Sequence, residues 1–156
     1  MPGEALFVGI ATVAVVVAGF AAIAPALAAG GSAWTAGQRF RLRGIVSTSF
    51  NVTFESLLPA VLFPALNDAR TTIVLTSAVV FCYAVFVISF RARQLILAGT
   101  RWVAWTRFVV GMGVSATALF GLNALVFASV TAYALALCIQ LSVAAISFYS
   151  LAAAAE

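Results

Sequence analysis

The stretch FVVGMGVSATALFGLNALVFASVTAYALALCIQLSVAAISFYSLAAAA, residues 108–155, contains no charged residue. A single helix of that length would extend about 70 Å, whereas the hydrocarbon core of a bilayer is about 30 Å thick. We therefore expect the segment to fold back once. The predicted turn is Gly121-Leu122-Asn123-Ala124, because glycine and asparagine accept turn conformations and both flanks are long enough to cross a membrane.

The rest of the chain has the same apolar character. It is 65% hydrophobic and 8% charged, whereas a soluble domain has about 25% charged residues. Nothing outside the apolar segments is long enough to fold separately. The sequence therefore predicts an all-α integral membrane protein, a bundle of about five transmembrane helices in one domain, 1–156. The predicted spans are 5–29, 44–66, 71–90, 102–122 and 124–150.

An alternative for the first span is a cleaved signal peptide, because Ala24-Pro25-Ala26-Leu27-Ala28 resembles a small-residue cleavage site. Against it, the first residues include the acidic Glu4 rather than basic residues, and the apolar run is longer than the usual signal. We expect the first span to be retained.

The distribution of arginine predicts the orientation. Every basic residue is arginine, and all but Arg70, which lies beside Asp68 in the opposite loop, gather before the second span (Arg39, Arg41, Arg43) and between the third and fourth (Arg91, Arg93, Arg101, Arg107). Five spans put both groups on one side, which should be cytoplasmic because cytoplasmic loops are rich in positive charge. Trp34, Trp102 and Trp105 fall near the same side. The prediction is a multi-pass protein of the cell inner (plasma) membrane with its N-terminus outside and its C-terminus cytoplasmic.

Missing residue types exclude several kinds of chemistry. Without lysine no Schiff base to retinal or pyridoxal phosphate can form, and without histidine there is no imidazole acid, base or haem ligand. Cys82 and Cys138 lie in separate apolar runs and do not suggest a metal site. We expect no enzyme activity, no cofactor and no metal. A nucleic-acid partner is not expected either, because the arginines do not form a basic face on a soluble module.

Glu55 is the carboxylate predicted near the middle of a span. An ionisable group at that depth costs at least ~2.5 kcal/mol, unless it faces the bundle interior, is paired or is protonated. One interpretation is an ion or proton site. The other is a protonated carboxyl group that only joins two helices by a hydrogen bond.

Neighbouring residues extend a polar face along this span. Asn51 and Glu55 are four residues apart and share one side of the helix with Ser47. Tyr83 in the third span and Gln140 in the fifth should lie near the level of Asn51, so they are candidate partners. Each alone is better explained as a helix-to-helix hydrogen bond. Pro59 and Pro64 follow Glu55 and suggest a possible hinge, and Pro59 also frees the carbonyl of Glu55.

Two further surfaces are predicted. Gly113, Thr117 and Gly121 repeat small residues every four positions, which allows a close helix contact, either internal or between subunits. The arginines follow the positive-inside rule, and Arg107 lies close enough to its span to snorkel to the interface or to reach a buried acid. A sharper hypothesis is contact with anionic lipid by Arg39, Arg41, Arg43, Arg91 and Arg93.

Two functions fit these features. The first is a small homo-oligomeric, cation-preferring ion channel or transporter in which rings of Asn51 and Glu55 surround the axis. The alternative is a non-catalytic accessory or scaffolding subunit of a larger membrane complex, with its polar residues buried as fasteners. The lipid bilayer is a partner in both cases. Contact of Glu55 with water would distinguish them.

Overall fold

The computed structural model describes residues 1, 3–28, 36–97 and 104–152, and within these ranges the secondary structure is entirely helical. Each of the five α-helices is long and apolar enough to cross a membrane. A π-helical segment lies between the last two α-helices. The elements are α1 (Glu4–Ala28), α2 (Ala36–Leu66), α3 (Ala69–Leu97), α4 (Ala104–Leu122), the π-helical η1 (Asn123–Phe127) and α5 (Val130–Ala152).

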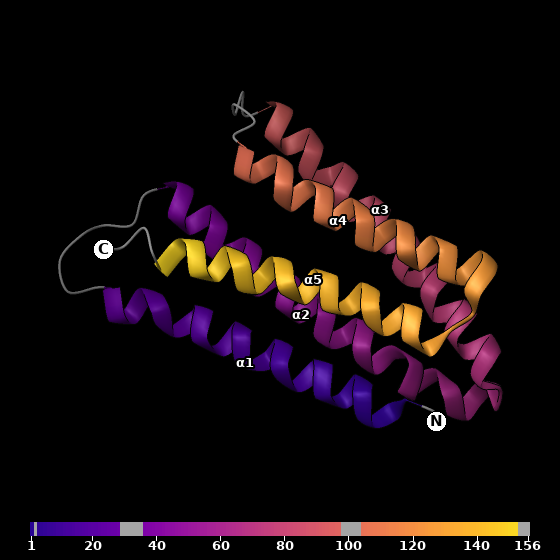
Figure 1. The fold of residues 1–156 in the computed structure, drawn as a ribbon. Coiled ribbons are helices and arrows are strands. Elements are labelled where there is room, and N and C mark those ends of the chain that lie inside the picture. The colour runs from indigo at the N-terminus through magenta and orange to yellow at the C-terminus, as the bar shows by residue number, and fades with distance from the viewer. Residues whose placement is uncertain (2, 29–35, 98–103, 153–156) are drawn as a thin grey trace.

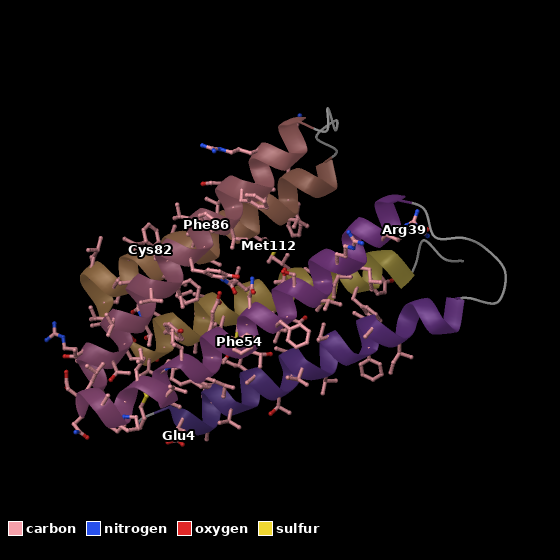
Figure 2. The ribbon with its side chains drawn as sticks, turned by 180° about the vertical axis from the view of Figure 1, so that it is seen from behind. Glu4, Arg39, Phe54, Cys82, Phe86 and Met112 are labelled. Carbon is pink, nitrogen blue, oxygen red and sulfur yellow. The ribbon has the colours of Figure 1, made fainter. Side chains whose placement is uncertain are left out.

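Consecutive helices run antiparallel, so the molecule has two distinct ends (Figure 1). We call one the arginine end, which holds Arg39 and Arg43 of α2, Arg93 of α3 and Arg107 of α4. The other is the turn end, with Glu4, Asp68 and Ala128. Figure 2 shows Glu4 and Arg39 at these opposite ends. Helix α5 contacts all four other helices, whereas α2 and α3 meet at the turn end and separate toward the arginine end.

The core forms where small residues let α1 approach its neighbours. Its buried residues recur every three or four positions, which places them on one face of the helix. Alanine dominates this face, so the backbones can pack closely, as small residues allow in membrane bundles. The buried residues of α1 are Phe7, Ile10, Ala11, Ala14, Ala18 and Ala21.

Two helices extend at the arginine end beyond their predicted membrane spans, while the apolar parts, Leu42–Leu66 and Ala69–Phe90, lie close to the predicted ranges. Helix α2 begins at Ala36 rather than at Gly44, and α3 continues to Leu97 rather than ending at Phe90. The predicted ranges followed apolar character, but arginine and glutamine are good helix formers and prolong a helix beyond its apolar part. The described arginines, Arg70 included, therefore lie in helices rather than in loops.

The predicted turn at Gly121-Leu122-Asn123-Ala124 was wrong in position. Helix α4 passes into η1, and the chain reverses at Ala128, which has a positive φ of 47°. Asn123 is fully buried; its side-chain oxygen accepts the Ser129 N–H at 2.8 Å and its amide donates to the Ser77 hydroxyl at 2.9 Å. Asn123 thus fixes the start of α5 instead of forming the turn.

The connection between α2 and α3 needs only Asn67 and Asp68. Asn67 has a positive φ of 51°, a conformation that asparagine tolerates better than most residues. Asp68 caps α3, because its carboxylate accepts the Thr71 N–H at 2.7 Å. This short connection makes α2 and α3 neighbours at the turn end.

Candidate functional site

Glu55 lies inside the helix bundle, and its side chain is only 6% exposed. Gln140 of α5 forms a hydrogen bond to its carboxyl group. The second carboxyl oxygen, Oε2, is buried and has no hydrogen-bond partner among the residues that the structure describes. No ion pair in this part of the chain involves Glu55 either. The carboxyl group therefore retains an acceptor position that nothing in the described protein fills.

The backbone carbonyl of Glu55 is the second feature of the site. Pro59 lies four residues later and has no N–H to donate, so this carbonyl lacks its usual helical partner. The hydroxyl of Tyr133 in α5 donates to it at 2.6 Å. Tyr133 is completely buried. A side chain from another helix thus replaces the hydrogen bond that the proline removes.

Asn51 and Tyr83 form a polar pair on the arginine-end side of Glu55. The Tyr83 hydroxyl donates to the side-chain oxygen of Asn51 at 3.1 Å, which joins α3 to α2. Asn51 is half-buried, but Tyr83 is 45% exposed. The pair lies within the apolar spans of both helices. In apolar surroundings such a polar pair would be expensive to leave uncovered.

Most other buried hydroxyl groups are satisfied within their own helices. Ser56 donates to the Val52 carbonyl at 2.6 Å, and Thr76 donates to the Thr72 carbonyl at 2.8 Å. Thr117 does the same with Gly113 at 2.9 Å. In the part of the chain described, the buried side-chain atoms without a partner are Oε2 of Glu55 and Oγ of Ser49. Glu55 is the ionisable one.

The structure thus brings the four predicted polar residues into two pairs, Asn51 with Tyr83 and Glu55 with Gln140. Glu55 points into a single protomer. A ring of Glu55 carboxyl groups around an oligomer axis would need these side chains on the outer surface, which their burial does not allow. Both predicted hinge residues lie inside α2, which continues through them; Pro59 is buried and Pro64 is exposed.

The small residues in the row on α4 differ in their contacts with the rest of the protein. A Cβ atom at Gly121 would lie 3.0 Å from the ring of Phe81 in α3, so this glycine permits an internal contact. Gly113 would meet nothing within 4 Å, and Thr117 is buried. The close contact at Gly121 is therefore within the protomer.

Five arginine side chains are described and all are exposed, Arg39, Arg43, Arg93 and Arg107 at the arginine end and Arg70 at the turn end. Arg107 forms no ion pair with a described acid, so the structure does not bring it to Glu55. The side chains of Arg41, Arg91 and Trp105, and all of Arg101, Trp34 and Trp102, lie outside the description. No group of three His, Cys, Asp or Glu residues that could hold a metal occurs in the described ranges.

Two contributions were missed by sequence reasoning. Tyr133 is not among the residues singled out from the sequence, although the carbonyl freed by Pro59 signals that a donor must lie opposite. Asn123 was taken as a turn residue, and no local pattern indicates that its side chain is buried against Ser77.

Comparison of the chain with models of known protein families, with curated proteins and with solved structures found no match.

Proposed function

We propose that the chain is an integral protein of the plasma membrane with five spans, its N-terminus outside and its arginine end at the cytoplasmic face. The outer surface supports this proposal, because large apolar side chains there are exposed, among them Phe54 at 71% and Phe86 at 68% (Figure 2). A surface of this kind suits lipid better than water. The gathering of exposed arginines at one end supports the orientation.

We further propose that the protein is a small ion transporter or channel whose binding group is Glu55. One observation carries the proposal: an acid that is 6% exposed keeps an unpartnered oxygen and has no basic partner among the described residues. An intramembrane carboxyl group that serves only packing would be expected to use its hydrogen-bonding capacity. An oxygen left open is suited to receive a proton or a cation.

The polar residues nearest Glu55 indicate where such a route would run within one protomer. Asn51 lies one turn closer to the arginine end, and its partner Tyr83 is partly exposed. An ion moving from the arginine end would pass this polar pair before it reaches the carboxyl group. The path is therefore proposed to lie between α2, α3 and α5, rather than along the axis of an oligomer.

The accessory-subunit function keeps a specific observation in its favour. Gly111 and Gly113 face open space on α4, and the Asn51–Tyr83 pair is only partly covered. A second copy of the chain or another membrane protein packed against either feature would cover it. In that case Glu55 would be a dry, protonated carboxyl group.

Ion flux into liposomes that contain the purified protein tests the proposal. Glu55→Gln keeps the size of the side chain and one acceptor oxygen but removes its titratable group, so we expect flux to be lost or its selectivity altered. Glu4→Gln is the matched control, because Glu4 is exposed at the turn end and pairs only with the N-terminus. Absence of flux from the intact wild-type protein would favour the accessory-subunit function, whereas equal flux from wild type and Glu55→Gln would show that Glu55 is not the binding group.

A further inference from the structure

The oxygen atoms around Glu55 limit what it can bind. The Asn51 side-chain oxygen accepts from Tyr83, and the Glu55 carbonyl accepts from Tyr133. The hydroxyl of the adjacent Ser56 donates to its own helix. Calcium and magnesium ions take about six or more oxygen ligands, and potassium filters use rings of unengaged carbonyls. The described residues offer no such cage, but a proton needs only one oxygen.

The two sides of Glu55 also differ. An aromatic layer is formed by Phe7, Phe120 and Tyr133. The ring centroid of Tyr133 lies 5.5 Å from that of Phe7 and 5.2 Å from that of Phe120, and both contacts are edge to face. All three are completely buried. They come from the first turn of α1, the last turn of α4 and the first turn of α5, so the layer lies toward the turn end.

Toward the arginine end a second apolar cluster, built on Ala21, Ile45 and Ala144, packs between α1, α2 and α5. The α3 side of α2 is more open there, because Tyr83 is 45% exposed. Gln140 lies two turns beyond Tyr133 on α5, and Asn51 and Tyr83 follow, with Tyr83 partly exposed. The polar side chains on this side include the exposed Tyr83. Toward the turn end, the packed aromatic rings are accompanied by Thr76, Ser77 and Asn123, all of which are buried.

We infer that Glu55 takes up a proton rather than a coordinated metal cation, and that the proton reaches it from the arginine end past Asn51 and Tyr83. This inference rests on the proposed function of Glu55 as an ion site. Uptake of one proton by Oε2 converts the carboxylate into a neutral carboxyl group, and no other reactant is needed. In this conformation the aromatic layer separates the site from the turn end.

Few other titratable groups could confuse the assignment. The helices that contact α2 are α1, α3 and α5. The titratable side chain of α1 is Glu4, which lies at the turn end. The Tyr83 hydroxyl of α3 is hydrogen-bonded to Asn51, and the Tyr133 hydroxyl of α5 is hydrogen-bonded to the Glu55 carbonyl. Cys82 and Cys138 are exposed, as are Arg93 on α3, Tyr149 on α5 and Arg39 and Arg43 on α2 itself.

Labelling by dicyclohexylcarbodiimide tests the chemistry without requiring transport. This apolar reagent reacts with protonated carboxyl groups, and mass spectrometry locates the adduct. With purified protein between about pH 5 and about pH 9, we expect an adduct at Glu55 that decreases as the pH rises, is absent in Glu55→Gln and is unchanged in Glu4→Gln. Excess sodium, potassium or calcium should not protect Glu55. Protection by any of these cations, or no adduct at any pH, would overturn the inference.

Sealed vesicles test the direction of access. The orientation of the protein in the vesicle is determined first. Cys82 and Cys138 are replaced by alanine, and one new cysteine is introduced, Arg93→Cys at the arginine end or Arg70→Cys at the turn end. A membrane-impermeant thiol reagent then shows which end faces the outside. With different pH values on the two faces, labelling of Glu55 should follow the pH at the arginine end. Labelling that follows the turn end would contradict the inference. Because labelling needs no net flux, a failure of transport is distinguishable from a failure of proton uptake.

Discussion

At the scale of single residues, Tyr133 joins more helices than any of the polar residues predicted as site residues. Its hydroxyl donates to the Glu55 carbonyl, and its ring packs against Phe7 and Phe120. One side chain of α5 therefore contacts α1, α2 and α4. The hydroxyl completes the backbone that Pro59 leaves open, and the ring forms the centre of the aromatic layer.

Tyr133→Phe should therefore destabilise the protein while leaving the ring contacts in place. The substitution leaves the buried Glu55 carbonyl without a donor, which costs about 1–3 kcal/mol in soluble proteins, whereas hydrogen bonds between membrane helices average about 0.6 kcal/mol. We expect a loss of about 1 kcal/mol, measured by unfolding in mixed micelles. Tyr149→Phe is the control, because Tyr149 is 74% exposed. Equal stability of the two variants would contradict this role of the hydroxyl.

Asp68 gives a pH-dependent prediction outside the spans. Hydrogen bonds from the side chain and then the backbone of Thr71 lower the pKa of Asp68 below its ordinary value of 3.8. A lowered pKa in the folded state means that the carboxylate stabilises the fold above the ordinary pKa and loses this effect as the pH falls through the folded value. The difference in thermal midpoint between wild type and Asp68→Ala, in non-ionic detergent, should therefore shrink below about pH 4. A difference independent of pH would argue against the cap.

At the scale of elements, the small residues of α4 have unequal roles. Gly121→Ala places a Cβ atom 3.0 Å from the Phe81 ring, so α3 and α4 must separate slightly or the ring must move. We expect a loss of about 1 kcal/mol in unfolding free energy, typical of mild overpacking. Gly113→Ala meets nothing within 4 Å and should be neutral or more stable by about 0.5–1 kcal/mol, because alanine favours the helix. Greater damage from Gly113→Ala would instead point to an interface on that face.

Helix α2 shows how a broken local rule is compensated. Proline is disfavoured within helices, yet α2 contains Pro59 and Pro64 and remains helical to Leu66. For Pro59 the compensation is the Tyr133 hydroxyl on the Glu55 carbonyl. The proline and the tyrosine are far apart in sequence, so the compensation exists only when α2 and α5 are packed.

At the scale of the whole molecule, charge is distributed unevenly between the two ends. The arginine end has exposed Arg39, Arg43, Arg93 and Arg107, and none of them forms an ion pair with a described acid. The turn end has Glu4 and Asp68 together with Arg70. Arg39 and Arg43 are four residues apart in the first turns of α2, so they share one face of the helix. That face is suited to lipid phosphates.

Replacing Arg39 and Arg43 by glutamine should weaken binding of phosphatidylglycerol. Each arginine near an anionic surface contributes about 1 kcal/mol, so the double variant should lose about 2 kcal/mol, roughly 30-fold in affinity. Native mass spectrometry of the protein titrated with this lipid measures the change, with phosphatidylcholine as the neutral reference. Arg70→Gln at the opposite end should have little effect. An equal loss in Arg70→Gln would mean that total charge, not the arginine end, governs binding.

The sequence determined the features that depend on composition along the chain. Apolar length required the stretch after Arg107 to fold back, and the five helices follow from the same criterion. Periodicity placed Asn51 and Glu55 on one face, and the level of each residue in its helix made Tyr83 and Gln140 candidate partners. These inferences needed only helix geometry and the thickness of a bilayer.

Tertiary packing decided the rest, because it brings together groups that are distant in sequence. The chain reverses at Ala128 rather than at Gly121–Ala124, since Asn123 is held by Ser77 and Ser129 while Gly121 is needed beside Phe81. Likewise, Glu55 faces the interior of one protomer because α5 packs against α2 and contributes Gln140 and Tyr133. A single helix has a polar face by sequence alone, but which helix covers that face depends on how all five helices pack.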